Sequence, residues 1–388
     1  MKRVVFFLFS LFFFCFSVYA EEFDITGEYV SLYNMNEDML LYSKNDTKKT
    51  SIASLTKMMT TLVAIENIDD LEKVVTIKES DFDGTVGYSK AGFSVGDKVT
   101  YLDLLYGIIL PSGADAVNAI VNNTLGYNSF IKKMNETAKK IGMNDTSFAN
   151  PIGKDDENNY STSSDIAKLL KYALKNETFK KVFTTKSYKT SNGINLESTV
   201  NSYKSILNTG KILGAKSGFT KNAGRCLASI TTLNGVDYLL VVINSSTSSP
   251  SNAVKDTITI YDYYSSNYGY KNILNDDTFI KEIPVDLSKE KTYKITGNED
   301  VNKYLKNSDE VTYEYVGSDK ITFNTKKGSK LGVVNIYNGD ELIATSNVYL
   351  ENNIEYYPIV TYVLIFIGVI FILLIIRKSK KKHRRRRR

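Results

Sequence analysis

The sequence predicts an α+β protein, in which an antiparallel sheet backed by a helical cluster precedes a small all-β domain and an apolar C-terminal helix. Three observations support this prediction. Segments with strand alternation lie at both ends of a helix-rich region between residues 29 and 264. Short alternating runs separated by turns begin at residue 281. An uncharged apolar run of helical length then covers residues 359–376.

Residues 1–20 are expected to be a secretory signal peptide. The basic start Met1–Arg3 precedes an apolar stretch, and small or tolerated residues allow cleavage after Ala20. An uncleaved membrane anchor is the alternative. Bulky phenylalanines directly before Cys15 argue against a lipoprotein. Removal of the signal would leave Cys226 as the only cysteine, so no intramolecular disulfide could form. The hydrophobic core must therefore hold the fold together.

Residues 23–272 are expected to form one domain that opens with a β-hairpin over 29–34 and 39–44. The next stretch, residues 51–66, has no Gly or Pro and is apolar at helical spacing, which predicts a helix buried on most sides. Further helices are expected over 101–121, 130–141, 161–174 and 252–264. A hairpin over 187–200 and strands over 213–220, 226–233 and 238–244 complete the predicted domain.

Residues 278–352 are expected to form an all-β stalk domain. Its predicted strands cover 281–287, 292–295, 311–316, 320–324, 331–337 and 341–350. Asn338-Gly339 is a favoured hairpin corner. Because this region contains no cluster of reactive groups, its expected role is to space the first domain from a membrane.

Residues 357–376 are expected to cross the membrane. As a helix, the run 359–376 would be roughly 27 Å long, close to the bilayer core of about 30 Å. The basic segment 377–388 follows directly and reads as a cytoplasmic tail, which places the folded domains outside the cell. The formal charge of +6 drops to about −6 without the ten basic residues of the tail and the two of the signal. This charge argues against nucleic acid as a partner.

Ser54 and Lys57 are the side chains in the buried helix that burial alone does not explain. A separation of three residues places both on one helical face, so the amine can reach the hydroxyl. A serine whose base is a lysine is a known nucleophile arrangement. Taken alone, such a pair is most often a helix cap and a solvated amine. The interpretation therefore depends on partners elsewhere in the chain.

Two later segments supply such partners. LPSGADA (110–116) places Ser112 in a Pro/Gly turn ahead of an apolar helix. LGAKSGFT (213–220) places Lys216 and Ser217 on a predicted strand, where Gly218 allows another backbone to approach closely.

Several other chemistries are excluded by composition. The only histidine is His383 in the predicted tail, so the extracellular part has no Ser-His-Asp triad and no histidine-ligated zinc. A single mature cysteine cannot form a thiolate metal site, and no metal or other cofactor is expected. The carboxylate pairs Asp69-Asp70 and Asp155-Asp156 lie in turns and read as solvated or capping groups.

The order and context of these segments resemble the Ser-x-x-Lys, Ser-x-Asn and Lys-Thr-Gly set of penicillin-binding proteins and serine β-lactamases. Flanking residues resemble the low-molecular-weight D-alanyl-D-alanine carboxypeptidases in particular, over residues 29–264. These flanks are ASLTKMMT (53–60), LLYG (104–107), FANPIG (148–153) and AGRCL (223–227). The resemblance implies a penicillin-binding-protein/β-lactamase-like transpeptidase fold. It also implies a peptidoglycan stem-peptide substrate and covalent inhibition by β-lactam antibiotics.

The resemblance assigns a role to each motif residue. Ser54 would be the nucleophile, Lys57 its base and Ser112 a proton relay. Lys57 must be neutral to accept a proton, and burial together with the charge of Lys216 would lower its pKa. Lys216 and Ser217 would bind the terminal carboxylate of the substrate. The backbone N–H groups of Ser54 and Phe219 would form the oxyanion hole, and the remaining expected substrate-binding residues are Gly218 and Thr220.

The sequence departs from the family pattern at two positions. Ala114 stands where the second motif usually has Asn, so one contact is missing or comes from elsewhere, and Asn118 is one candidate. Ser217 stands for the usual Thr and keeps the hydroxyl. The alternative to an active carboxypeptidase is a catalytically weak homologue that binds peptidoglycan or a partner without turnover. A β-lactamase and a D,D-endopeptidase are further alternatives.

Overall fold

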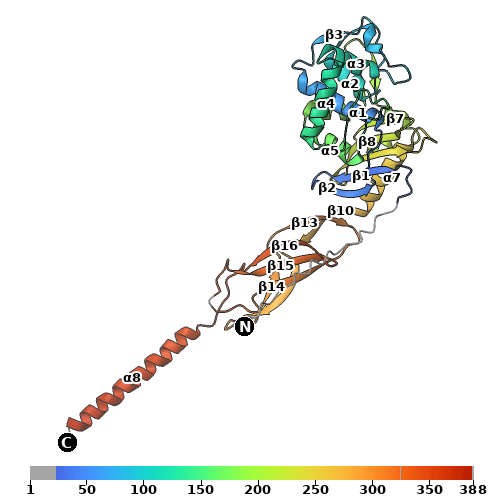
Figure 1. The fold of residues 1–388 in the computed structure, drawn as a ribbon. Coiled ribbons are helices and arrows are strands. Elements are labelled where there is room, and N and C mark those ends of the chain that lie inside the picture. Colours follow the sequence, from blue (N-terminus) through green and yellow to red (C-terminus); the bar gives the residue numbers. More distant parts are fainter. Residues whose placement is uncertain (1–22, 324, 387–388) are drawn as a thin grey trace, which may run out of the picture. The chain divides into compact units, whose positions relative to one another are not determined.

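The computed structural model describes residues 23–323 and 325–386. The chain divides into two compact units, Met1–Ser266 and Asn267–Arg388, which are considered separately (Figure 1). The predicted signal peptide, residues 1–20, lies outside the described residues.

The first unit is built on a five-stranded antiparallel sheet in the order β2-β1-β9-β8-β7. Its strands are β1 (Tyr29–Asn34), β2 (Met39–Lys44), β7 (Gly214–Thr220), β8 (Gly224–Leu233) and β9 (Val236–Ser245). Two short strand pairs lie outside this sheet: β3 (Val74–Thr76) with β4 (Lys98–Thr100), and β5 (Ser187–Lys189) with β6 (Asn195–Glu197). Strand β7, which carries the third motif, is therefore an edge strand of the main sheet.

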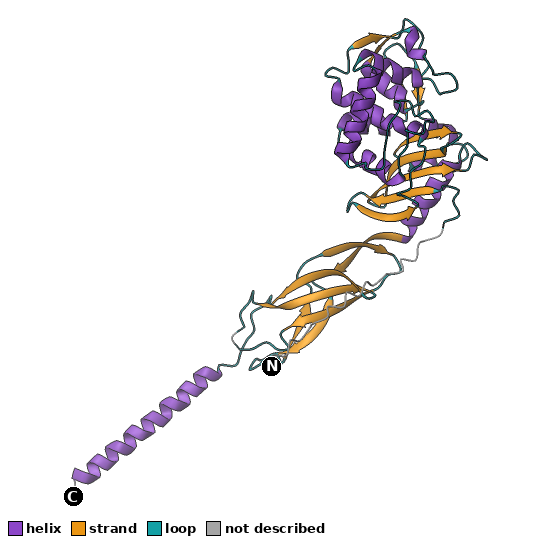
Figure 2. Cartoon of the chain, in the orientation of Figure 1, coloured by secondary structure: helices purple, strands orange, loops and turns teal. Residues whose placement is uncertain are grey.

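Helices cover both faces of this sheet, as Figure 2 shows in purple. The helices of the unit are α1 (Thr56–Asn67), α2 (Tyr101–Ile109), α3 (Ala114–Asn123), α4 (Tyr127–Ile141), α5 (Ser163–Ala173), α6 (Glu177–Thr184) and α7 (Asn252–Asn267). Ser31 on β1 bonds to Ser163 on α5 (2.8 Å) on one face. Ser229 on β8 bonds to Tyr261 on α7 (2.9 Å) on the other. The predicted α+β class with an antiparallel sheet is confirmed.

The central helix differs from its prediction at its start. Residues Ala53–Leu55 form a 3₁₀ turn, η1, and the α-helix begins at Thr56. Side chains along α1 are buried on most sides, as predicted: Leu55, Met58, Met59, Leu62 and Val63 are at most 1% exposed. Ala53 has a φ of 45°, a left-handed conformation that a side chain with a Cβ adopts only when its surroundings enforce it.

The predicted helix over residues 101–121 is interrupted at the second motif. Helix α2 ends at Ile109 and α3 begins at Ala114. Ser112, between them, has a φ of 68°. Pro111 lacks the N–H that a continuous helix would need, and the left-handed Ser112 breaks the helical path. Because of this break, Ser112 lies just before the first residue of the buried helix α3 and not along the side of one continuous helix.

Asp256 ties helix α7 to the N-terminal segment of the sheet. Its carboxylate accepts hydrogen bonds from the Gly27 N–H (2.9 Å), the Thr26 hydroxyl (2.9 Å) and the Ser245 hydroxyl (2.7 Å). With the Thr26 N–H (3.2 Å) the carboxylate has four donors, and it holds its element firmly because loss of any one leaves a desolvated group. The first turns of α7 are thereby fixed beside β8 and β9.

The second unit is all-β apart from its last helix. Its strands are β10 (Tyr268–Leu274), β11 (Phe279–Pro284), β12 (Thr292–Thr296), β13 (Val301–Lys306), β14 (Val311–Gly317), β15 (Lys330–Asn338) and β16 (Glu341–Tyr349). They pair as β10-β13, β11-β12 and β14-β15-β16 around a core that includes Leu274, Ile295 and Ile336.

Two details of this unit differ from the sequence-based expectation. The predicted strand 320–324 is reduced to a single bridge between Ile321 and Val285, and residue 324 is not described. Strands β10 and β13 were not predicted, because polar residues interrupt their alternation. Since β10 pairs with β13, it belongs to the second compact unit, which begins at Asn267.

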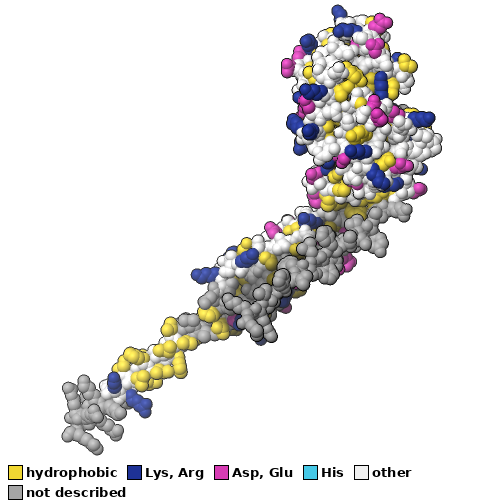
Figure 3. Space-filling model, viewed as in Figure 1, with side chains coloured by type: hydrophobic (Ala, Val, Ile, Leu, Met, Phe, Trp, Pro, Cys, Tyr) yellow, Lys and Arg dark blue, Asp and Glu magenta, His cyan; other side chains and the backbone are white. Residues whose placement is uncertain are grey.

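The chain ends in helix α8 (Ile359–Arg386). Its window Tyr362–Ser379 is long and apolar enough to cross a membrane, by length and composition. Figure 3 shows apolar side chains in yellow along the described part of this helix, which none of the described residues covers.

Candidate active site

Ser54 and Lys57 meet at the start of helix α1. The Lys57 Nζ lies 2.8 Å from the Ser54 Oγ, as the three-residue spacing predicts. The same amine donates to the carbonyl oxygen of Ile152 at 2.8 Å. Ser54 lies in the 3₁₀ turn, and Lys57 is the second residue of α1. The hydrogen bond to the Ile152 carbonyl holds the Lys57 amine in the orientation in which it contacts the Ser54 hydroxyl.

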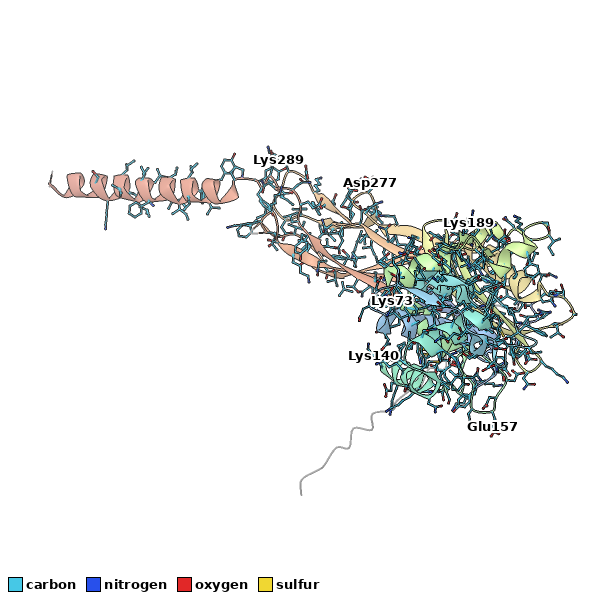
Figure 4. All side chains as sticks on the ribbon, turned by 90° about the horizontal axis from the view of Figure 1, so that it is seen from above. Lys73, Lys140, Glu157, Lys189, Asp277 and Lys289 are labelled. Atoms are coloured by element: carbon cyan, nitrogen blue, oxygen red, sulfur yellow. The ribbon has the colours of Figure 1, made fainter. Side chains whose placement is uncertain are left out.

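Burial gives Lys57 the properties of a base. Its side chain is 1% exposed, and desolvation lowers its pKa to about 7, against the opposing effect of Asp115. Surface lysines such as Lys140, labelled in Figure 4, lie on the outside of the unit instead. A lysine with a pKa near 7 is largely neutral in mildly alkaline solution and can accept the Ser54 proton.

Lys216 is the second buried lysine. Its side chain is 0% exposed, and its Nζ donates to the Ser217 carbonyl oxygen at 2.8 Å. Burial and then the charge of Lys57 lower its pKa well below the usual value. The expected effect of Lys216 on the Lys57 pKa is not found, because burial lowers that pKa and the charge of Asp115 opposes the shift.

A cavity of about 260 Å³ opens beside these groups. Its lining includes five predicted site residues: Ser54, Ser112, Ser217, Gly218 and Phe219. Lys57 and Lys216 lie behind this lining. The Thr220 side chain does not reach the cavity, because its hydroxyl donates to Asp155 at 2.6 Å and accepts from the Ala223 N–H at 3.0 Å. Thr220 thus shapes the turn between β7 and β8.

Strand β7 runs directly against the turn that carries Ser54. A Cβ added to Gly218 would lie 3.0 Å from the Ser54 nitrogen and 3.1 Å from the Ala53 Cβ. Glycine allows this approach without a shift of the neighbouring backbone, whereas a residue with a Cβ would be tightly crowded. The close contact brings the β7 backbone next to the nucleophile.

Several groups at the site were not predicted from sequence. Thr199 lines the cavity, and its hydroxyl lies 2.6 Å from that of Ser217. Arg225 and the segment 87–89 also line it. The Ile152 carbonyl belongs to FANPIG, a segment that the sequence singled out without assigning it a role. No motif marks Thr199, because only the folded chain brings it to β7.

Ala114 stands where the second motif usually has Asn, and helix α3 supplies no replacement for the amide of that residue. Asn118 does not compensate, because its amide donates to the carbonyl oxygens of Asp81 and Asp83, both at 3.0 Å. The Ala114 N–H donates to the Ser89 carbonyl at 2.8 Å, which places the cavity-lining segment 87–89 next to the second motif.

Comparison with known proteins agrees with this arrangement. Residues 17–247 match the family model of D-alanyl-D-alanine carboxypeptidases. The chain belongs to this family. Its members are serine-type peptidases. The prediction that this chain is a serine-type D-alanyl-D-alanine carboxypeptidase is therefore confirmed. Residues 268–356 match the C-terminal domain of penicillin-binding protein 5.

Relatives of this carboxypeptidase differ in how much of the chain they match. The D-alanyl-D-alanine carboxypeptidase DacF of Bacillus subtilis (strain 168) is 28% identical over 83% of this chain and 84% of its own length. A D-alanyl-D-alanine carboxypeptidase of Streptomyces sp. (strain K15) is 34% identical over 54% of this chain and 78% of its own. The solved structure of penicillin-binding protein 5 from Haemophilus influenzae shares the fold (TM-score 0.62, 23% identity, 86% of this chain and 99% of that one).

The rate of Ser54 acylation is expected to depend on pH through Lys57. Below a pKa of about 7 the amine is protonated and cannot accept the hydroxyl proton, so the rate should fall about tenfold per pH unit. Above that pH it should level off. The second-order rate constant for benzylpenicillin, measured between pH 5 and 9, tests this profile. A rate that is flat across the range would contradict the assignment of Lys57 as the base.

Proposed function

We propose that this carboxypeptidase removes the terminal D-alanine from peptidoglycan stem pentapeptides through an acyl-enzyme on Ser54. The observation that carries the proposal is the 2.8 Å contact between Ser54 Oγ and a buried Lys57 Nζ whose pKa is about 7. No described histidine or metal-binding cluster offers a competing way to activate a nucleophile.

The first step is attack on the carbonyl carbon between the last two D-alanines. Neutral Lys57 takes the Ser54 proton while the Oγ–C bond forms. Backbone N–H groups of Ser54 and Phe219 would hold the oxyanion, each contributing roughly 3–4 kcal/mol. As the C–N bond breaks, Ser112 gives its hydroxyl proton to the departing amine of D-alanine and takes the proton that Lys57 holds, so Lys57 is neutral again.

The second step is hydrolysis of the acyl-enzyme. Water attacks the ester carbonyl, gives a proton to Lys57, and Ser54 Oγ leaves with a proton returned from the same base. A β-lactam would acylate Ser54 in the same way, but its ring-opened leaving group stays attached and the ester persists. Penicillins are therefore expected as covalent inhibitors.

Helix α8 would anchor this chemistry at the cell membrane. Its apolar window Tyr362–Ser379 is followed by basic residues, which favour a cytoplasmic tail and an extracellular catalytic unit. The signal peptide 1–20, the catalytic domain 23–272, the stalk 278–352, the span 357–376 and the tail 377–388 fit this topology. Membrane lipid would contact the helix, and the net negative charge of the outer part argues against nucleic acid as a partner.

The test uses the full chain in detergent with a stem pentapeptide and benzylpenicillin. Wild type should release D-alanine and gain the mass of one penicillin. Ser54→Ala should do neither, with a loss of D-alanine release of at least about 10³-fold, because the nucleophile is gone. Ser94→Ala, at an exposed serine, should behave as wild type.

Two results would contradict the proposal. Penicillin attachment in Ser54→Ala would place the nucleophile elsewhere. Attachment to wild type without any D-alanine release would favour a homologue that binds peptidoglycan without turnover, which the missing Asn at Ala114 would explain.

A further inference from the structure

Three segments of the second unit meet at the end from which helix α8 leaves. Segment 285–291 joins β11 to β12, segment 318–329 joins β14 to β15, and segment 350–358 leads from β16 into α8. The Tyr357 N–H donates to the Leu287 carbonyl oxygen at 2.7 Å, which ties the last of these segments to the first. We call the three segments the foot of the second unit.

Further contacts hold the foot together. The Asp286 N–H donates to the Ile321 carbonyl oxygen at 2.8 Å, and the Asp286 carboxylate pairs with Lys320 at 2.7 Å. The Tyr356 hydroxyl donates to the Thr322 carbonyl oxygen at 2.9 Å. Each segment of the foot is therefore bonded to another one, and their exposed side chains keep a fixed position relative to the start of α8.

The foot exposes three large apolar side chains. Leu287, Phe323 and Tyr357 are 48%, 49% and 51% exposed. Leu287 also has a φ of 55°, a left-handed conformation that is costly for leucine. A single exposed apolar residue needs no explanation, but three on bonded segments, one of them in a strained conformation, indicate a surface that contacts something else.

Lysines accompany these apolar side chains. Lys326 and Lys327 are exposed in the segment between β14 and β15, and no carboxylate of the described residues pairs with either amine. Lys289, labelled in Figure 4, also belongs to the foot and pairs with Glu355 at 2.7 Å. Surfaces of this composition bind at the boundary between lipid headgroups and acyl chains, because the apolar groups leave water while the amines meet lipid phosphates.

The chain connection to α8 keeps the foot close to any membrane that this helix crosses. The apolar window begins at Tyr362, five residues after Tyr357. Five residues reach at most about 18 Å when fully extended. The structure has them partly helical, since α8 begins at Ile359, and this shortens the distance further. A headgroup layer is roughly 5–8 Å thick on each side of the hydrocarbon core, so the foot lies within reach of it.

We propose that the foot binds the outer lipid surface of the membrane. Leu287, Phe323 and Tyr357 enter the headgroup layer, and Lys326 and Lys327 bind lipid phosphates. This inference rests on the anchoring by α8 that belongs to the proposed function, and it adds a second, separate contact with the bilayer. With two contacts, the second unit cannot pivot freely about the short connection to its helix.

The test uses tryptophan as a reporter, because the chain has no natural tryptophan. Leu287→Trp and Phe323→Trp each place one indole in the foot. Phe279→Trp is the matched control, since Phe279 is 57% exposed at the opposite end of β11 from the foot. Phe371→Trp, inside the apolar window of α8, reports on anchoring itself. The full chain is reconstituted into vesicles of phosphatidylcholine and phosphatidylglycerol, with or without bromine on the acyl chains next to the headgroup, because bromine quenches an indole that it contacts.

Brominated lipid should remove about half or more of the indole emission of Leu287→Trp and Phe323→Trp, because both indoles would lie at the depth of the bromine atoms. Emission of Phe279→Trp should change by less than about one-tenth, since that site stays in water. Phe371→Trp should be quenched whether or not the foot binds lipid.

The role of the lysines is tested in the Leu287→Trp background. Lys326→Gln with Lys327→Gln should lower the quenching about twofold, and so should vesicles without phosphatidylglycerol, because the attraction to anionic headgroups is lost. Lys180→Gln with Lys181→Gln is the matched control and should change nothing, since these two adjacent exposed lysines lie on α6 of the first unit. Equal quenching with and without Lys326 and Lys327 would overturn their assignment to lipid phosphates.

The reporters separate failure of the inference from failure of the anchor. If Phe371→Trp is quenched but neither foot reporter is, the inference is wrong and the anchoring by α8 stands. A blue-shifted but unquenched indole at Leu287 would also overturn it, because a second copy or another protein would then cover the foot. If Phe371→Trp itself is not quenched, the proposed anchoring fails and the inference fails with it. Release of D-alanine by wild type is measured separately and depends on neither outcome.

Discussion

Replacing Lys57 by methionine is expected to slow acylation of Ser54 by at least about 10³-fold. The amine is the group within hydrogen-bond distance of the Ser54 hydroxyl that can take its proton, at 2.8 Å. Methionine has a similar length and fits an apolar site, but it has no basic atom. The benzylpenicillin acylation rate at pH 8 measures the loss.

The same variant is expected to be more stable than wild type at neutral pH. Burial lowers the Lys57 pKa from 10.5 to about 7, so the unfolded chain binds a proton that the folded chain gives up between these values. Wild-type stability is therefore reduced by about 5 kcal/mol at or below pH 7, and this penalty disappears toward pH 10.5. Loss of the bonds to Ser54 and Ile152 offsets part of the gain.

A rise of about 2–4 kcal/mol in the free energy of unfolding at pH 7 is the expected net result. Urea unfolding of wild type and Lys57→Met at pH 7 and pH 10 measures it, and the difference should shrink at the higher pH. Lys221→Met, at an exposed site, is the control and should change neither stability nor acylation. If Lys57→Met is less stable than wild type by the same amount at both pH values, the buried amine does not lower the stability of the wild-type protein as predicted.

Gly153→Ala is expected to damage both the fold and the nucleophile. A Cβ at this position would lie 2.0 Å from the Ala53 carbonyl oxygen and 2.6 Å from the Ala53 carbonyl carbon. Both atoms belong to the backbone of the turn that carries Ser54, so neither can swing aside. Gly153 also has a φ of +87°, which adds strain for any residue with a Cβ.

We expect Gly153→Ala to lose about 3 kcal/mol or more of stability and at least about 100-fold in acylation rate. Gly193→Ala is the matched control: its φ is +91°, but no atom lies within 4 Å of the added Cβ. It should lose only about 1 kcal/mol and acylate normally. If both variants acylate at the wild-type rate, the contact between residue 153 and the nucleophile turn is not required for activity.

The parts of the site that sequence predicts are those encoded within a few residues. Ser54 and Lys57 share one turn, so their contact follows from spacing alone. Ser112 is marked by its Pro/Gly turn, and Lys216 and Gly218 by their strand. The five-stranded sheet is largely predictable for the same reason, because the apolar run 238–243 marks β9 and apolar or β-branched residues make up most of β8.

The parts that sequence does not predict depend on contacts between distant residues. Thr199 and Arg225 look like ordinary polar residues until β7 brings Ser217 and Phe219 beside them. The Ile152 carbonyl is a backbone atom, whose partner no side-chain pattern reveals. In the second unit, β10 and β13 are stabilised by pairing with each other. The alternation of apolar residues within each strand is weak, so neither strand is recognised from its sequence alone.

The single described thiol, that of Cys226, offers a built-in reporter for the sheet that presents the substrate strand. It is 1% exposed on β8, between β7 and β9, and burial raises its pKa to about 12. The thiol borders the cavity but is almost fully buried, so alkylation requires a local opening next to it and its rate would record that opening. No second cysteine among the described residues would compete for the reagent.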